Sequence, residues 1–426
     1  MSGHLIANFS FLAATELRKH AFSIIEAGIK GVETKKALNR ITRLDKDVLH
    51  VNGKKYHLKK YDEIFVIGIG KAALEAGRVL DSLLGSRITG GIILDVKKGR
   101  LKNIESIAGT HPFPSLSNMQ ATGKIMGILK HIKANDLLIA VVSGGGSALL
   151  SWPYAMKHED MRYVIGSLMK KGARIKEINT VRKHLSEIQG GQFAKMAYPA
   201  DIVGLIFSDV PGDDLSTVAS GPIVLDPTTV QDARKVLKKY GLDKKMAEDV
   251  FRETPKDPKF FTKVYNVLVV SNTLAAEAMK EKALSLGYKA KIFSTVIEGE
   301  ARKVGKKLAR LPQKGEAVIA VGETTVKVRG KGKGGRNQEL VLGGLPFVPE
   351  DGILVSCASD GIDNTMAAGA LADACLRDIA KRKKMEVEKY LSNNDSFHFF
   401  EKTGGQIMTG VTGVNVSDLM LSMRQR

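Results

Sequence analysis

A repeated pattern in the first half of the chain constrains the fold more than any other feature. Short runs that are apolar almost throughout lead into turns rich in glycine, serine or aspartate, and then into amphipathic segments; the runs cover residues 63–67, 91–94, 137–142 and 202–207. Strands that are apolar along their whole length are buried on both faces. Their alternation with helices predicts an α/β fold with a parallel sheet covered by helices.

The helices expected between these strands follow the helical spacing of apolar side chains. In the first half they cover residues 71–84, 117–133 and 158–171, after two amphipathic helices within residues 9–40. The alternation resumes later, with strands expected at 264–270, 289–293, 316–321, 324–329 and 353–358, and helices at 272–286, 299–310 and 370–384. The second half is therefore expected to form another α/β domain.

The length of the chain, 426 residues, is too great for one ordinary hydrophobic core. A charged stretch at 241–263, which contains Pro255 and Pro258, marks a boundary. We expect an N-terminal Rossmann-like α/β domain over residues 1–245 and a C-terminal α/β domain over residues 246–426.

The charge balance indicates an anionic partner. The net charge is +20, which favours nucleic acid, an acidic membrane surface or a small phosphorylated or carboxylated molecule. Aromatic residues make up only 6%, and the basic residues are spread along helical segments and not interleaved with aromatics. That distribution favours a solvated basic surface, which can also draw small anionic substrates inward, with no nucleic-acid partner.

The targeting and cysteine patterns favour the cytoplasm. The N-terminal residues do not resemble a signal peptide, and no apolar run approaches the ~20 residues of a membrane helix, so no membrane association is expected. Cys357 and Cys375 make neither a disulfide framework nor a four-ligand zinc site, and their small apolar neighbours predict buried thiols. Monomer and homodimer both remain open.

The first glycine turn follows the strand at 63–67. Residues 68–73 fit the G-x-G-x-x-A pattern of dinucleotide-binding turns, with Asp95 at the end of the next strand, so an NAD(P) enzyme is one interpretation. Lys71 indicates another. A cation at a helix N-terminus is disfavoured by the helix dipole, and a bound carboxylate or phosphate would relieve this.

The second glycine turn follows the strand at 137–142. Its small side chains leave backbone N–H groups open to a phosphate or carboxylate; the residues are Ser143, Gly144, Gly145, Gly146 and Ser147. It is not a Walker A loop, because no Gly-Lys pair in the chain precedes Ser or Thr. Farther along, Arg182, Lys183 and Ser186 could share one helical face and grip anionic oxygens, or belong to a solvated basic helix.

Three further segments place polar groups after predicted strands. Asp209 follows the strand at 202–207 and could orient a hydroxyl or hold a metal, whereas Asp360 and Asp363 follow the strand at 353–358 and suit Mg²⁺. In residues 329–339, glycines alternate with cations and then open a helix, which suits a polyphosphate; the candidate contacts are Gly332, Gly334, Gly335, Arg336 and Asn337.

Taken in order, these runs resemble the glycerate 2-kinase family, the class with a MOFRL C-terminal domain. The resemblance covers roughly residues 10–421 and rests on VVSGGGSALL, NTVRKHLS, SDVPGDDLSTVASGP, GETTVKVRGKGKGGRNQELVL, SDGIDNTMAAGALAD and NDSFHFF with TGVTGVNVSDL. It implies ATP, Mg²⁺, glycerate and a 2-phosphoglycerate product. It also implies two α/β domains with the active site in the cleft between them, and it assigns the important basic residues to Lys71 and Arg336. The chain departs from the family pattern at Gln189, Asn364, Val411 and Val414.

Phosphoryl transfer needs alignment and charge neutralisation more than covalent help. The sequence therefore leads to a hypothesis in which residues 143–147 and 330–337 enclose the phosphates, and Asp209, Asp360 or Asp363 hold Mg²⁺. Lys71 and Arg336 neutralise the moving phosphoryl, and Asp209 orients the attacking hydroxyl. In this hypothesis the glycerate carboxylate is bound by Lys71, Arg182, Lys183 and Ser186. The alternatives are a kinase of another sugar acid, an NAD(P)-dependent hydroxypyruvate reductase, and a nucleic-acid-binding module.

Overall fold

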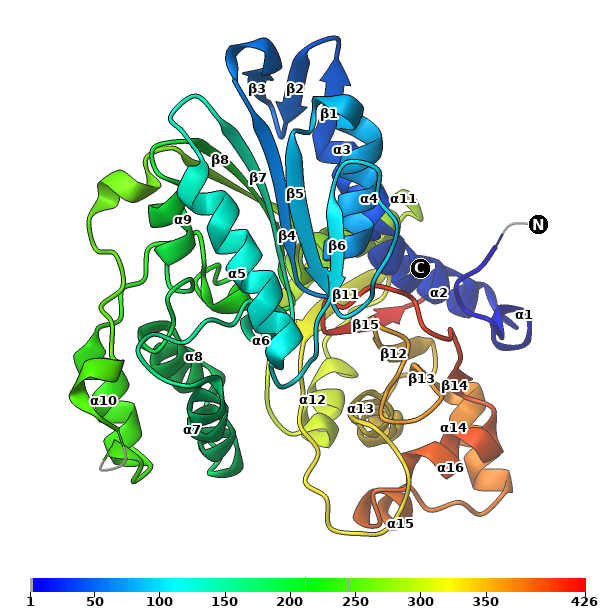
Figure 1. Cartoon of the computed structure of the whole chain (residues 1–426). Coiled ribbons are helices and arrows are strands. Elements are labelled where there is room, and N and C mark those ends of the chain that lie inside the picture. Colours follow the sequence, from blue (N-terminus) through cyan, green and yellow to red (C-terminus); the bar gives the residue numbers. More distant parts are fainter. Residues whose placement is uncertain (1–2, 211, 244–245) are drawn as a thin grey trace. The chain divides into compact units, whose positions relative to one another are not determined.

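The structure is a computed structural model that describes residues 3–210, 212–243 and 246–426, and the side chains of all of these except Glu248. It contains two compact units (Figure 1). The parallel-sheet unit comprises the described parts of residues 37–208 and 214–269. The mixed-sheet unit comprises the described parts of residues 1–36, 209–213 and 270–426. Among the described residues, no helix combines the length and apolar character needed to span a bilayer.

The parallel-sheet unit is built on a six-stranded sheet of order β6-β5-β4-β7-β8-β9, in which the pairs from β6 to β8 are parallel. The strands are β4 Ile64–Ile69, β5 Gly90–Asp95, β6 Glu105–Ala108, β7 Leu137–Ser143, β8 Asp201–Phe207 and β9 Val264–Val270. Every residue of β7 is buried, as its apolar run predicts. The prediction of an α/β fold with a Rossmann-like parallel sheet is confirmed.

Helices cover this sheet and carry the loops that follow the strands. Helix α4 packs on β4 and β5, and α5 packs on β5 and β6. The helices in this part of the chain are α3 Thr34–Ile41, α4 Ala73–Leu84, α5 Leu116–His131, α6 Gly146–Leu149, α7 His158–Lys170, α8 Ile175–His184, α9 Gln192–Ala197 and α10 Val230–Lys239.

A small antiparallel sheet in this unit was not predicted. It consists of β1 Thr42–Asp45, β2 Val48–Val51 and β3 Lys54–His57. These strands are short and half exposed, so they lack the apolar runs that mark the main sheet. The pair Asn52–Gly53, with both φ angles positive, was the available signal, because Asn-Gly favours a two-residue hairpin turn.

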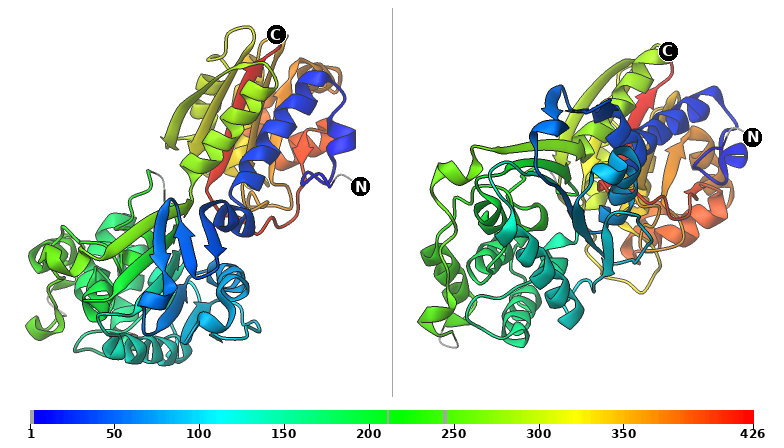
Figure 2. Two further views of the ribbon diagram at one scale, coloured as in Figure 1. Left: turned by 90° about the horizontal axis from the view of Figure 1, so that it is seen from above. Right: turned by 45° about the horizontal axis from the view of Figure 1, so that its top comes forward.

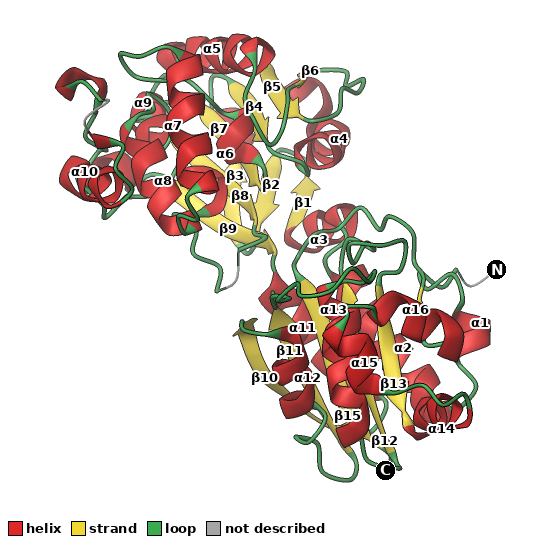
Figure 3. Ribbon diagram, turned by 90° about the horizontal axis from the view of Figure 1, so that it is seen from below, coloured by secondary structure: helices red, strands yellow, loops and turns green. Residues whose placement is uncertain are grey.

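The mixed-sheet unit has strand order β10-β11-β15-β12-β13-β14, in which only the β10–β11 pair is parallel. Figure 2 shows the C-terminal strand β15, in red, among the strands of this sheet. The strands are β10 Lys289–Ile297, β11 Glu316–Gly322, β12 Gly352–Ala358, β13 Gly369–Asp373, β14 Gln406–Ile407 and β15 Asp418–Arg424. Its helices (Figure 3) are α1 Phe9–Leu12, α2 Glu16–Gly31, α11 Asn272–Ser285, α12 Ala301–Leu308, α13 Arg336–Gly344, α14 Ala374–Arg382, α15 Val387–Ser392 and α16 Ser396–Thr403.

Several expectations for this unit were wrong in detail. Residues 369–373 form strand β13, so the helix expected at 370–384 begins only at Ala374. Residues 324–329 form no strand and contribute a single bridge, Glu300 to Thr325. The central strand β15 was missed because an antiparallel strand near the end of the chain does not belong to the strand–helix alternation. Cys375 is exposed, although Cys357 is buried as expected.

The two units do not follow the boundary at residues 245/246 that was expected from the sequence. Helix α2 packs on α11, where Gly28 and Gly31 lie so close to Met279 and Ala278 that a side chain at either glycine would collide. This close approach ties residues 16–31 to the mixed-sheet unit. Strand β9 completes the parallel-sheet unit, so that unit extends to residue 269.

Candidate active site

In the parallel-sheet unit, two glycine turns meet at the carboxyl ends of β4 and β7. The N–H group of Lys71 donates to the carbonyl of Gly144 at 2.9 Å. The hydroxyl of Ser143 donates to the carbonyl of Ile69 at 3.0 Å and accepts from the N–H group of Ala72 at 3.1 Å. Ser143 is buried, so it joins the two turns and does not present its hydroxyl to a ligand.

The side chain of Lys71 lies along the second turn. A Cβ atom on Gly145 would lie 3.1 Å from Cγ of Lys71 and 3.3 Å from Cδ2 of His111, and Gly145 has a φ of +81°. Both requirements favour glycine. Lys71 is exposed and forms no ion pair with any described residue. Its ammonium group is therefore open to a ligand beside the imidazole of His111.

Arg182 is a buried cation beside the same turns. It is 7% exposed, and its guanidinium donates to Oδ1 of Asn179 at 3.0 Å. No carboxylate among the described residues pairs with it, and burial lowers the pKa of Arg182 to about 10. Burial also lowers the pKa of His111, followed by the charges of Lys71 and Arg182. A buried, unpaired guanidinium in a region of positive potential is a built site for an anion.

A chain of hydrogen bonds connects Arg182 to the triple-glycine turn. Asn179 Oδ1 also accepts from Ser220 Oγ at 3.0 Å, and Ser220 Oγ lies 2.9 Å from Ser147 Oγ. Gln189, at a position where the family pattern has lysine, donates from Nε2 to the carbonyls of Ser147 and Leu150 at 2.9 Å each. These bonds hold Ser147 in place; Gly146 opens the short helix α6 directly before it.

Lys183 and Ser186, predicted together with Arg182, have other partners. Lys183 forms a buried ion pair with Asp226 at 3.2 Å. Ser186 is buried and its hydroxyl accepts from the N–H groups of Ile188 and Gln189 at 3.3 Å. Consecutive helical residues point about 100° apart, so Arg182 and Lys183 reach different surroundings. Of the predicted set, Arg182 and Lys71 share a neighbour, because the charges of both act on His111.

Asp95 does not have the environment that the dinucleotide interpretation needs. Its carboxylate accepts from the N–H groups of Leu74 at 2.9 Å and Lys97 at 3.2 Å, and the residue is 2% exposed. Burial raises the pKa of Asp95. The carboxylate therefore fixes the start of α4 instead of reaching a ribose hydroxyl.

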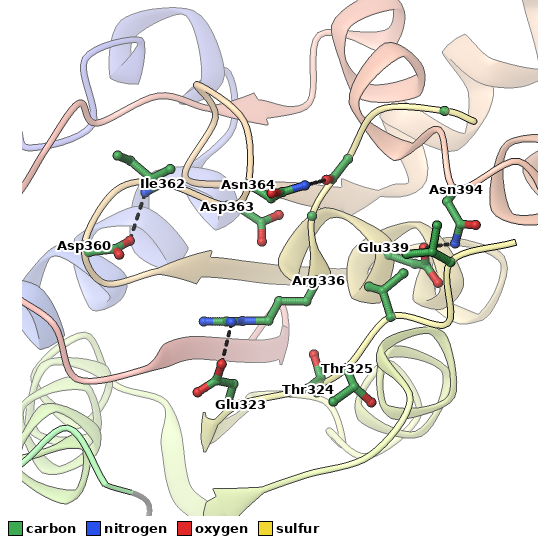
Figure 4. A pocket seen from close by; sticks show the side chains of 15 residues that line it. Glu323, Thr324, Thr325, Arg336, Glu339, Asp360, Ile362, Asp363, Asn364 and Asn394 are labelled. Atoms are coloured by element: carbon green, nitrogen blue, oxygen red, sulfur yellow. Dashed lines mark hydrogen bonds and ion pairs between the residues drawn. The ribbon is translucent and has the colours of Figure 1, made fainter. Parts of the chain in front are cut away.

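The mixed-sheet unit contains a cavity of about 650 Å³, a volume typical of ligand sites. Figure 4 shows Arg336 extending along this cavity, with Glu323 below its guanidinium. We call it the Arg336 cavity; its lining includes Glu323, Thr324, Gly332, Gly334, Gly335, Arg336, Asp360, Asp363 and Asn364. Thr324 is buried, and its hydroxyl has no hydrogen-bond partner among the described residues.

Arg336 is held by two carboxylates. Its Nε donates to Asp418 Oδ2 at 2.6 Å and one terminal nitrogen to Oδ1 at 3.1 Å, and the other terminal nitrogen donates to Glu323 at 2.6 Å. Asp418 is fully buried, which raises its pKa to about 6. Sequence reasoning missed Asp418; the signal was an aspartate directly before the apolar run at 419–421.

Asp363 and Asn337 build the start of α13. Asp363 accepts from the backbone N–H groups of Asn337 at 3.0 Å and Gln338 at 2.9 Å and from both side-chain amides. Asn337 is buried, and its Nδ2 bridges Asp363 at 3.2 Å and Asp418 at 2.9 Å. Both residues are thus engaged by the protein itself, although they were predicted as a metal ligand and a cofactor contact.

The other predicted metal ligands are Asp360 and Asp209, both in the mixed-sheet unit. Asp360 is half-buried, lines the Arg336 cavity, and accepts from Ile362 N–H at 3.0 Å through one oxygen. Asp209 is half-buried in the same unit, and its carbonyl accepts from Ser417 Oγ at 3.5 Å. Within the described residues, no three His, Cys, Asp or Glu side chains gather as a metal site. Mg²⁺ commonly takes one or two carboxylates and completes its shell with water and phosphate oxygens, which suits Asp360.

The glycine-rich loop before α13 packs against the segment 393–396. The N–H groups of residues 329–333 donate to Asn394 Oδ1, Asn393 Oδ1, Asn393 O and Asp395 Oδ1 at 2.7–3.1 Å. A side chain at Gly330 or Gly332 would collide with this segment, and one at Gly335 would collide with Asp363. The amides of residues 329–333 are therefore used internally, and only Gly334 and Gly335 remain candidates for phosphate contacts.

The fold and the two sites define an α/β protein with one uncompensated cationic site and one cavity built around a carboxylate-bound arginine. Residues 20–253 match the domain of unknown function DUF4147, and residues 316–418 match the MOFRL family. Glycerate 2-kinase from Pyrococcus horikoshii is 34% identical, over 97% of this chain and 98% of its own. The crystal structure of glycerate kinase from Thermotoga maritima matches with a TM-score of 0.85 and 33% identity, over 95% of this chain and 99% of that one.

The chain therefore belongs to the glycerate kinase family whose members combine a DUF4147 and a MOFRL domain. The predicted family is confirmed. A protein from Agrobacterium vitis that is named a putative hydroxypyruvate reductase is also similar, with 37% identity over 83% of this chain and 85% of its own.

Proposed function

We propose that this protein transfers a phosphoryl group from ATP to the 2-hydroxyl of (R)-glycerate and so makes 2-phosphoglycerate. The observation that carries the proposal is the buried guanidinium of Arg182, which has no carboxylate partner among the described residues and lies near Lys71 and His111. Such a group suits a small carboxylate. Relatives named glycerate 2-kinase support the same substrate.

In this proposal the parallel-sheet unit binds glycerate. Arg182 binds its carboxylate, and Lys71 neutralises charge that develops on the phosphoryl group. The 2-hydroxyl is adjacent to the carboxylate, so the phosphoryl group must approach a negative charge during the reaction. Clustered cations lower that barrier because they act where charge develops. This is the physical reason to expect the 2-hydroxyl, and not the 3-hydroxyl, as the acceptor.

The mixed-sheet unit contributes the Arg336 cavity as the site for the phosphates of ATP. Arg336 lies at the start of α13, directly after Gly334 and Gly335, where backbone N–H groups and the helix dipole favour an anion. Asp360 is the carboxylate best suited to hold Mg²⁺, with Asp209 as the further candidate. Bound there, Mg²⁺ would neutralise phosphate charge. Asp209 also remains our candidate for orienting the attacking hydroxyl.

The test is to mix the purified protein with ATP, Mg²⁺ and (R)-glycerate and to measure ADP release with and without excess EDTA. We expect glycerate-dependent ADP release that EDTA abolishes, because Mg²⁺ assists phosphoryl transfer. ADP release that ignores glycerate, or full activity in EDTA, would contradict the proposal. ADP release with longer aldonates, but not with glycerate, would identify a kinase of another sugar acid.

Reduction of hydroxypyruvate is the second candidate, because one similar protein carries that name. The buried and doubly hydrogen-bonded Asp95 weighs against NAD(P) at the first glycine turn. Oxidation of NADH or NADPH by hydroxypyruvate, without ATP, would favour this candidate. The cytoplasmic location stays a prediction, as do the absence of a nucleic-acid partner and the choice between monomer and homodimer.

A further inference from the structure

Asp418 binds the guanidinium of Arg336 from the start of the central strand β15. We propose that Asp418 is a positioning residue, which fixes the direction in which the guanidinium of Arg336 presents its remaining N–H groups to the Arg336 cavity. The inference rests on the proposed function, in which Arg336 contacts the phosphoryl group.

The guanidinium has five N–H donors in a rigid plane. Asp418 accepts one from Nε and one from a terminal nitrogen, and Glu323 accepts one from the other terminal nitrogen. One N–H group remains on each terminal nitrogen. Because the bond to Asp418 is bidentate, it fixes both the position and the plane of the guanidinium. The two remaining donors therefore have one defined direction.

Asp418 is itself held rigidly. It is the first residue of β15, where it pairs with Gly322 of β11 on one side and Ala358 of β12 on the other. Asn337 donates to its Oδ1 at 2.9 Å, and Ser356 donates to the side-chain oxygen of Asn337 at 2.5 Å. Since Asn337 also bonds Asp363, the carboxylate of Asp418 is linked to the start of α13 and to the central strands of the sheet.

The chain offers a matched pair elsewhere in the same unit. Arg18 donates to Asp373 through Nε at 2.6 Å and a terminal nitrogen at 2.9 Å, in the same bidentate arrangement. The side chain of Arg18 is 10% exposed and that of Arg336 is 34% exposed. Of the two arginines only Arg336 lines the cavity. The Arg18 pair is therefore the control for the loss of a buried pair that does not line the cavity.

The experiment compares Asp418→Asn with Asp373→Asn. Both variants lose a buried carboxylate partner of arginine, so both should lower Tm. Asp418→Asn should also lower kcat about 10- to 100-fold and change KM for ATP less than kcat, because a misdirected donor acts mainly in the transition state. Asp373→Asn should keep kcat within about twofold. Equal kcat values for the two variants would overturn the proposal.

A second comparison separates positioning from an independent role. If Asp418 acts through Arg336, then Asp418→Asn should add almost nothing to the kcat loss of Arg336→Ala. A multiplicative loss in the double variant would overturn the inference. Should Asp418→Asn fail to fold, Ser356→Ala is the milder change, because it removes only the donor to Asn337. Ser356→Ala should lower kcat severalfold when Arg336 is present. In the Arg336→Ala variant it should lower kcat no further.

NMR of the arginine Nε–H groups keeps this inference distinct from the proposed function. Arg336→Ala identifies the Arg336 signal in ¹⁵N-arginine-labelled protein. Asp418→Asn should speed hydrogen exchange at that group at least about tenfold, and Asp373→Asn should leave it unchanged. If the signal is unaffected by Asp418→Asn, positioning fails. If it responds but glycerate is not phosphorylated by the unmodified protein, the proposed function alone fails.

Discussion

The two sites hold their cations in opposite ways. Arg182 is buried without a carboxylate partner, near the exposed Lys71, whereas Arg336 is bound by Asp418 and Glu323. An unpaired cation attracts any small anion and so favours binding of the ground state. A cation whose charge is already offset by two carboxylates has no surplus positive charge and offers directed hydrogen bonds, which suits a transition state more than a tight ground-state complex.

The largest expected effect is on kcat after Arg336→Ala. Loss of a donor that stabilises the transition state typically costs about 10²- to 10³-fold or more. Lys71→Ala should lower kcat to a similar extent. Steady-state kinetics would measure the loss, and circular dichroism would check the fold. A folded Arg336→Ala protein with normal kcat would remove Arg336 from the mechanism.

The next largest effect is on glycerate binding after Arg182→Met. Loss of a charged hydrogen-bond partner should raise KM for glycerate about 10- to 100-fold. The same variant should keep or raise Tm, because the buried guanidinium has no carboxylate partner among the described residues and is costly to desolvate. A large fall in Tm with unchanged KM would show that Arg182 is a structural cation, and the contrast between the sites would fail.

A moderate effect should appear in the pH dependence. Burial raises the pKa of Asp418 to about 6, so kcat should fall as the pH decreases through about 6 and the carboxylate that holds Arg336 is protonated. The pKa is higher in the folded than in the unfolded chain. This group's contribution to the free energy of unfolding therefore decreases as pH rises from about 4 to about 6. Kinetics should show this acidic limb in the unmodified protein and not in Asp418→Asn.

The smallest effect on catalysis is expected from Lys183→Met, next to Arg182 on α8. Lys183 forms a buried pair with Asp226, so its loss leaves an uncompensated carboxylate and should destabilise the fold by about 3–5 kcal/mol. Near-normal KM and kcat with a lower Tm would sharpen the contrast with Arg182. A rise in KM equal to that of Arg182→Met would mean that the two cations act as one site.

The difference between Arg182 and Lys183 also shows what sequence could and could not predict. The motif placed both on one helix after the second glycine turn, and spacing alone treated them as equivalent. Which one meets a carboxylate depends on Asp226, 43 residues away along the chain. The parallel sheet, by contrast, was predictable because a strand that is buried on both faces is visible in the sequence as a run of consecutive apolar residues.

Long-range packing explains the other misses. Gly330 and Gly332 suggested a phosphate cradle, but their small size is required by the segment 393–396. No local sequence pattern indicated the role of Asp418, because its partners Arg336 and Asn337 lie 82 and 81 residues earlier in the chain. Glycine and aspartate occur both in ligand sites and in tightly packed segments. The sequence alone therefore does not distinguish the two roles, whereas the tertiary structure does.

The regiochemistry of the product tests the central claim most directly. The protein is given ATP, Mg²⁺ and (R)-glycerate together with enolase, pyruvate kinase, lactate dehydrogenase and NADH, with phosphoglycerate mutase left out. A matched reaction without enolase measures any NADH consumption that does not pass through phosphoenolpyruvate, and this background is subtracted. Because enolase accepts the 2-phosphate, we predict enolase-dependent consumption of NADH from the start. Enolase-dependent consumption that begins only after mutase is added would mean that the 3-hydroxyl is phosphorylated, and it would contradict the account.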